Sequence, residues 1–192
     1  MKLTIDLDSK SVQNAIRELY RAKYNVPKAL DELLYLSCER IALLANQNLE
    51  WTEIGDLVKE RIKASWDISA ANGVATLTNL YEKAVYVEFG TGVVGEQNPH
   101  ANARKAGYDY NVDSPYKDEQ GRWVFYADYA ELDMPMSALE DITVFRKDNA
   151  SRMQIRTSGA PATMFVFNAI MRFKSENHAK ELWEQVKAKY WG

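Results

Sequence analysis

Apolar residues recur at helical spacing through the first fifty positions of the chain. Residues 12–19 follow the spacing of one helix face, and Asp8 or Ser9 precedes them as a capping residue. Pro27 predicts a break, because the residue before a proline disfavours the helical conformation, and it then opens a second helix. That second helix carries a continuous apolar stripe made of Leu30, Leu33, Leu34, Cys38, Ile41, Leu44, Ala45 and Leu49.

The pattern changes from helical to alternating after Gly55. Apolar and polar residues alternate over residues 62–68, which predicts a half-buried strand. Asn72-Gly73 is a tight-turn dipeptide, so residues 74–79 are expected to return as the second strand of a hairpin. Residues 84–89 form a third apolar run, either a strand or a short helical turn, that ends at Gly90.

Acidic residues and turn formers dominate residues 93–152. Nine acidic and two basic residues lie between Asp109 and Asp141. A long irregular stretch of this kind is typical of a functional insertion, so we expect an inserted acidic arm. Within it the sequence predicts a strand at residues 123–126 and a hairpin that joins residues 142–145 to residues 153–157.

The last helical pattern follows the segment 158–161, with Pro161 expected near its first position. Phe165 and Ala169 lie four residues apart, and the polar residues 174–177 separate this helix from a C-terminal helical extension at 175–192. The order of elements predicts one α+β domain over residues 1–192. We expect an antiparallel sheet with the N-terminal helices and a long C-terminal helix packed against it.

One cysteine and two histidines among 192 residues narrow the possible chemistry. Cys38 lies on the apolar stripe, where a small buried residue is the expected role, and a lone cysteine excludes an internal disulfide. His100 and His178 stand alone in polar company, so we expect both at the surface and no metal site built on histidines. No stretch approaches the ~18 apolar residues of a membrane span. We therefore expect a soluble protein with no cofactor, no bound metal and no membrane contact.

The net charge of −3 is divided unevenly along the chain. Residues 1–145 carry 15 basic and 23 acidic residues, a net of −8, whereas residues 146–192 carry 9 and 4, a net of +5. Surfaces that read duplex DNA are usually basic, so the acidic larger part argues against sequence-specific DNA binding. We expect the basic C-terminal region to meet an acidic surface of a neighbouring subunit or of another protein.

Residues 90–95 spell the glycine motif G-x-G-x-x-G, which in dinucleotide-binding folds brings a pyrophosphate to a helix N-terminus. The context differs, because Pro99 would interrupt the helix that should follow and alternating strands and helices are missing. The carboxylates Asp128, Glu131 and Asp133 do not have the spacing of a metal loop, and a solvated acidic loop is the expected role. We expect no enzyme, and a small nucleotide-binding enzyme that uses residues 90–95 stays an alternative.

The wider segment around these glycines resembles a known signature. Residues 81–92, YEKAVYVEFGTG, are similar to the pattern YA-x-YVEFGTG of a phage family variously called minor tail, tail-completion or head–tail joining proteins of long-tailed phages. Gly55-Asp56-Leu57 matches a G-x-L segment that enters a strand hairpin in that family. A G-x-x-A-x-x-F-x-x-x-A helix of the family is matched by Gly159, Ala162, Phe165 and Ala169. The resemblance covers roughly residues 10–92 and 155–173, and the acidic segment and the C-terminal extension depart from it.

The resemblance implies an α+β virion protein without catalysis, assembled in the host cytoplasm. Such proteins form a ring, typically a hexamer, at the neck between the portal connector and the tail tube, and genome DNA passes through without sequence-specific binding. An intracellular protein-binding module is the other alternative. The residues expected at partner surfaces are Trp123, Tyr126, Asp128, Glu131, Asp133, Arg172, Trp183 and Tyr190.

The signature residues have structural roles in this interpretation. Gly90 and Gly92 turn the chain sharply, with Thr91 between them. Tyr86 and Phe89 are expected to pack where the helix with Phe165 and Ala169 arrives. For Glu88 two roles stay open: acceptor of backbone N–H groups or of a basic side chain, or an exposed strand carboxylate.

Overall fold

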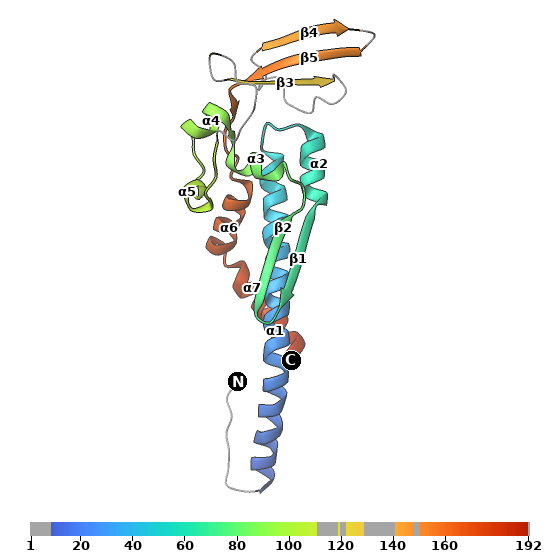
Figure 1. Ribbon diagram of the computed structural model, residues 1–192. Coiled ribbons are helices and arrows are strands. Elements are labelled where there is room, and N and C mark those ends of the chain that lie inside the picture. Colours follow the sequence, from blue (N-terminus) through green and yellow to red (C-terminus); the bar gives the residue numbers. More distant parts are fainter. Residues whose placement is uncertain (1–8, 111–118, 120–121, 129–140, 148–149, 192) are drawn as a thin grey trace.

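One long helix forms the axis of the molecule. The computed structural model describes residues 9–110, 119, 122–128, 141–147 and 150–191. Helix α1 (Ser9–Glu50) runs through the body, and its amino-terminal half extends beyond it (Figure 1). The break predicted at Pro27 is wrong, because Pro27 lies inside α1. Pro27 and Lys23, whose carbonyl has no N–H partner at Pro27, are both exposed residues.

A short helix and a hairpin follow α1. Helix α2 (Asp56–Ala64) leads into β1 (Trp66–Ala71), which pairs antiparallel with β2 (Val74–Asn79). The predicted hairpin is confirmed, and its turn residues Asn72 and Gly73 both have positive φ, as this turn requires. The strand predicted over residues 62–64 is wrong, since Ile62 belongs to α2, four residues after Val58, and both pack into the core.

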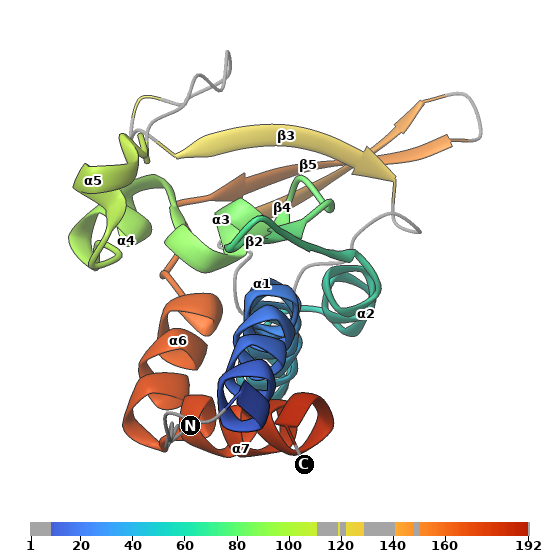
Figure 2. The same cartoon turned by 90° about the horizontal axis from the view of Figure 1, so that it is seen from below.

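The C-terminal helices lie beside α1. Helix α6 (Phe165–Ser175) and helix α7 (His178–Trp191) are separated at the predicted polar interval. Seen along the axis of α1, the two helices, α2 and the hairpin surround it (Figure 2). The helix start predicted at Pro161 is wrong. Residues Gly159–Ala160 form the short strand β6, and α6 begins only at Phe165.

The middle of the chain contains three short helices and a second sheet. Helices α3 (Ala84–Phe89), α4 (Gly92–Gln97) and α5 (Ala103–Ala106) precede strands β3 (Trp123–Asp128), β4 (Asp141–Lys147) and β5 (Ala150–Thr157). The three strands form an antiparallel sheet in the order β3-β5-β4. This sheet lies at the end of the molecule opposite the free end of α1 (Figure 1). The strand at residues 123–126 and the second hairpin are confirmed, and the apolar run 84–89 is a helix.

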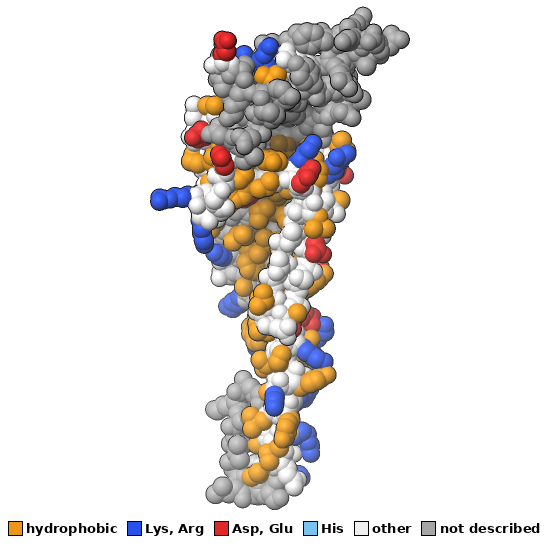
Figure 3. All heavy atoms as spheres, in the orientation of Figure 1, with side chains coloured by type: hydrophobic (Ala, Val, Ile, Leu, Met, Phe, Trp, Pro, Cys, Tyr) orange, Lys and Arg blue, Asp and Glu red, His pale blue; other side chains and the backbone are white. Residues whose placement is uncertain are grey.

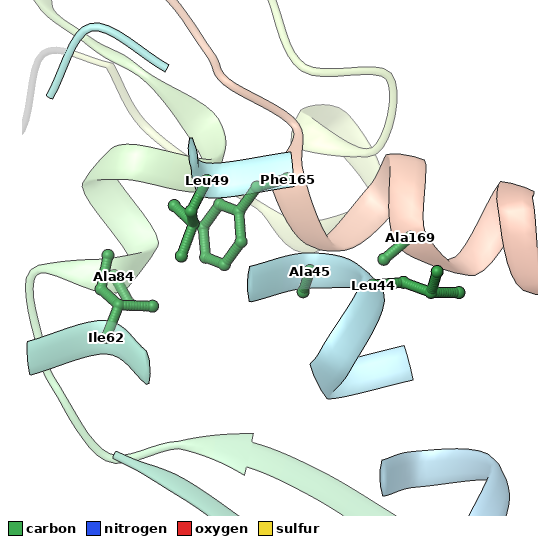
Figure 4. Close-up of a cluster of buried hydrophobic side chains, with 7 residues drawn as sticks. All are labelled: Leu44, Ala45, Leu49, Ile62, Ala84, Phe165 and Ala169. Atoms are coloured by element: carbon green, nitrogen blue, oxygen red, sulfur yellow. The ribbon is translucent and has the colours of Figure 1, made fainter. Parts of the chain in front are cut away.

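The core forms where α1, α2, α3 and α6 meet, beneath the first hairpin. Its buried members converge from these four helices in Figure 4 and are Leu44, Ala45, Leu49, Ile62, Ala84, Phe165 and Ala169. The α+β class is confirmed. Among the described residues, however, β1 to β5 form two separate sheets, and α6 and α7 pack on α1 and not on a single sheet.

Candidate functional site

The two motifs that carry the family resemblance lie against each other. Thr91 pairs with Ala160 and Gly92 with Gly159 in an antiparallel bridge. The Ala160 N–H also donates to the Thr91 hydroxyl oxygen at 3.1 Å, across 69 positions of sequence. We call this contact of residues 86–92 with residues 158–169 the motif junction.

Backbone meets backbone at the junction, which only glycine allows. A Cβ on Gly90 would lie 2.6 Å from the Ala162 nitrogen, and a Cβ on Gly92 would lie 2.5 Å from the Ser158 oxygen. A Cβ on Gly159 would lie 1.9 Å from the Thr91 oxygen. All three glycines also have positive φ, which other residues adopt only with strain. The expected sharp turn at Gly90 and Gly92 is therefore confirmed, and its cause is the close approach of a second chain segment.

Glu88, in the last turn of α3, caps the start of α6. Its Oε2 accepts the Val166 N–H at 2.8 Å and its Oε1 accepts the Phe167 N–H at 2.9 Å. The first N–H groups of a helix have no partner within the helix, and the helix dipole favours a negative charge there. Glu88 is buried. Of the two roles left open, acceptance of backbone N–H groups is confirmed and the exposed strand carboxylate is wrong.

His100 is the second polar group of this cap. Its Nε2 lies 2.9 Å from Glu88 Oε1, and its Nδ1 accepts the Asn102 N–H at 2.9 Å. Because Nδ1 is an acceptor, the proton of the neutral ring is on Nε2, which donates to the carboxylate. The surface position expected for His100 is wrong, since it is 4% exposed. No sequence signal points to this pair, because it joins residues across an irregular loop.

Aromatic rings close the outer side of the junction. The Phe89 ring lies 4.3 Å from the His100 ring and 4.7 Å from the Tyr108 ring, between centroids. The Tyr108 hydroxyl donates to the Gly90 carbonyl at 2.6 Å. Burial raises the pKa of Tyr108 to about 12, and the neighbouring Tyr86 and Tyr110 add to the shift. The phenol therefore stays a neutral donor that fixes the Gly90 turn.

The packing expected for Tyr86 and Phe89 is wrong. Tyr86 is 41% exposed, and Phe89 faces His100. The residues of α3 that pack in the core with Phe165 are Ala84 and Val87. Because residues 84–89 form a helix, positions 84, 87 and 88 share the face toward α6.

An open hollow of about 510 Å³ lies between the hairpin, α3 and α6. Apolar side chains gather over this part of the molecule in Figure 3, and those lining the hollow include Leu77, Val85 and Ile170. The carboxylate and imidazole side chains of its lining are Glu82, Glu88 and His100. Since Glu88 and His100 are engaged with each other and with α6, the hollow offers an apolar surface with one exposed carboxylate, Glu82.

Two backbone amides of the glycine motif are bonded within the chain. The Gly92 N–H donates to the Tyr110 carbonyl at 3.1 Å, and the Val94 N–H donates to the Ser158 carbonyl at 3.2 Å. These amides are therefore not free to hold phosphate oxygens. In the part of the chain that the structure describes, no group of three His, Cys, Asp or Glu side chains is suited to a metal ion. The Cys38 thiol is half-buried, and burial raises its pKa.

The residues expected at partner surfaces are spread over the molecule. Arg172 bonds to Glu176 and Asn48 of its own chain, and the Tyr190 hydroxyl donates to Glu32. Trp183 is 39% exposed. Trp123, Tyr126 and Asp128 lie on β3, whereas Glu131 and Asp133 lie outside the described residues. Their roles at partner surfaces stay predictions.

Comparison of the chain with known protein families, with characterised proteins and with solved structures finds no match. Over the described ranges, none of the helices combines the length and the apolar character needed to span a bilayer.

Proposed function

We propose that the chain is a structural subunit of the neck of a long-tailed phage. In this proposal it forms a ring, possibly of six subunits by the family resemblance, between the head connector and the tail tube. It acts by contact and not by catalysis, and genome DNA passes through the ring without being read.

The observation that carries the proposal is the motif junction. Both motifs of the resemblance, the glycine segment and the segment before α6, are used for internal geometry. Glu88, the acidic side chain of the YVEFGTG pattern, is held by two backbone N–H groups and a histidine. A signature used in this way supports a building block whose shape matters, as a ring subunit requires.

The proposal is tested on virions of the phage that encodes the chain. Gold-labelled antibodies against the chain are expected to bind at the junction of head and tail in electron micrographs. Deletion of the gene is expected to leave filled heads and separate tails, and a plasmid copy of the gene should restore joined particles. Label confined to another part of the virion, or joined particles without the gene, would refute the proposal.

A further inference from the structure

The amino-terminal part of α1 carries an exposed apolar stripe, while α7 meets another side of the same part of the helix, where Asn25 Nδ2 donates to the Tyr190 carbonyl at 3.0 Å. We call residues 9–30 the α1 extension, which is roughly 30 Å long at 1.5 Å per residue. Val12, Ile16, Leu19 and Val26 are 39–55% exposed, and Lys23 lies between the last two. Their spacing of four and three residues places all five on one face of the helix. Figures 1 and 3 show this part of α1 projecting past the tip of the hairpin with apolar side chains at its surface.

The stripe continues the side of α1 that the hairpin covers within the body. The Gly73 N–H at the hairpin tip donates to Asp31 Oδ1 at 2.7 Å, and a Cβ on Gly73 would lie 3.3 Å from Leu30. Beyond this point the hairpin ends while the apolar spacing goes on. A large apolar face of this kind on a projecting helix marks a site of protein contact.

The same chain also carries a concave apolar surface, the hollow between the hairpin, α3 and α6. It is open, its lining includes Val85 and Leu77, and Glu82 is the exposed carboxylate of that lining. The α1 extension cannot enter the hollow of its own chain, because it is continuous with the straight helix that forms the axis of the body (Figure 1). A second copy can supply it.

We propose that the α1 extension of one copy docks in the hollow of the next copy. The inference deepens the proposed function, since it names the contact from which a ring would be built. In the docked state the apolar stripe is covered by the hollow and Lys23 meets Glu82. The contact joins two different surfaces, so that it repeats from copy to copy and closes into a ring when the rotation allows.

Charge decides between this contact and pairing of two α1 extensions. Residues 9–30 carry five basic residues and one acidic residue, a net of +4, whereas the lining of the hollow contains the carboxylates of Glu82 and Glu88 and no Lys or Arg. Two paired extensions would bring like charges together and bury Lys23 beside a second basic helix. Docking in the hollow of the next copy instead places the basic segment on a lining that holds Glu82 and no Lys or Arg, and it gives Lys23 a carboxylate partner.

Two single-cysteine variants test the contact in the purified full-length chain. Both carry Cys38→Ser, and one adds Ile16→Cys on the stripe while the other adds Val85→Cys in the hollow. Under mild oxidation we expect a disulfide-linked dimer in the mixture and not in either variant alone. Cross-linking of the Ile16→Cys variant with itself would overturn the proposal in favour of paired extensions, and no cross-link in the mixture would overturn it outright.

A matched control and a charge exchange complete the test. Asn14→Cys places the thiol on the opposite side of the same helix and is expected not to cross-link with Val85→Cys. Lys23→Glu is expected to weaken self-association about tenfold in sedimentation experiments, and adding Glu82→Lys should restore it. Unchanged self-association of the Lys23→Glu variant would count against the contact of Lys23 with Glu82. These measurements use the purified chain and no phage. They can refute the docking contact while the antibody label still places the chain at the neck, and the label can refute the neck position while the docking contact holds.

Discussion

The close approach of backbone at the motif junction can be tested by adding a methyl group at Gly92 and, as a control, at Gly107, because the two glycines have nearly the same φ. Gly92 has φ +62° and Gly107 has φ +64°. A Cβ on Gly92 would lie 2.5 Å from the Ser158 oxygen, whereas a Cβ on Gly107 would meet nothing within 4 Å. An alanine in the left-handed region costs about 1–2 kcal/mol, and a stiffer unfolded chain offsets about 0.4–1 kcal/mol of this. We therefore expect Gly107→Ala to lower the free energy of unfolding by about 0.5–1 kcal/mol.

Gly92→Ala has the same cost from its backbone angle and must also move the backbone of residue 158. Overpacking of this kind costs typically about 1–3 kcal/mol, so the total expected loss is about 2–4 kcal/mol. Urea unfolding followed by tryptophan fluorescence measures both variants, and an unchanged dependence on urea shows that stability alone has changed. Equal losses in the two variants, within about 0.5 kcal/mol, would refute the close approach at the junction.

Three further predictions concern the cap, the aromatic closure and the core. Glu88→Ala should lower the free energy of unfolding by about 2–5 kcal/mol, because it leaves two helix N–H groups and a buried histidine without an acceptor; the exposed Glu82→Ala should change it by less than about 0.5 kcal/mol in the same urea titration. Tyr108→Phe should remove a tyrosine that ionises near pH 12 from an ultraviolet titration. The pKa of Tyr108 in the folded chain, about 12, lies above the ordinary value of 10.0. The stability gained from the neutral phenol is therefore complete below pH 10 and is lost toward pH 12. The Tyr108→Phe variant lacks this phenol, so it should lose stability less steeply between pH 10 and pH 12. Leu49→Ala should cost about 2–5 kcal/mol in thermal or urea unfolding, and Leu57→Ala, which is half exposed, should cost much less; similar costs would contradict the assigned core.

Elements with strong local chemistry were predictable from the sequence. The turn at Asn72-Gly73 requires positive φ at both residues, and few other dipeptides adopt it. The interruption between α6 and α7 follows from a run of polar residues. By contrast, the break predicted at Pro27 did not form. A proline inside a helix removes one backbone hydrogen bond, and the rest of a long helix can tolerate that loss at an exposed position. The strand predicted at Ile62 is wrong because the end of α2 and the start of β1 together give an alternation of apolar and polar residues over 62–68.

The candidate site was only partly predictable. The sequence allowed Glu88 to accept backbone N–H groups, but it did not decide between that role and an exposed one, because residues 84–89 fit a strand or a helix equally. The same ambiguity misplaced Tyr86 and Phe89, since the face toward α6 depends on which of the two forms. His100 lies on a loop without periodicity, so nothing in its neighbourhood indicates burial.

The glycine motif shows why a spacing alone does not identify chemistry. In a nucleotide site, glycines allow a phosphate to approach the backbone. Here they allow another strand of the same chain to do so, and the amides that would hold phosphate are bonded to Tyr110 and Ser158. Both cases require a residue without a side chain. A phosphate fills the space in a nucleotide site, and a second backbone segment fills it here. It is Gly159, far along the sequence and itself without room for a Cβ, that distinguishes the two.

A consequence follows for the contacts of the chain with its partners. Gly90, Gly92 and Gly159 of the resemblance lie inside the motif junction, where the close approach of backbone leaves no room for a side chain. A docking surface such as the α1 extension needs only apolar character on one face and a suitable charge, which many residue combinations supply. A signature can therefore identify a building block while a surface such as the α1 extension leaves no motif. Such a surface has to be found from exposure, shape and charge, as the stripe with Lys23 is.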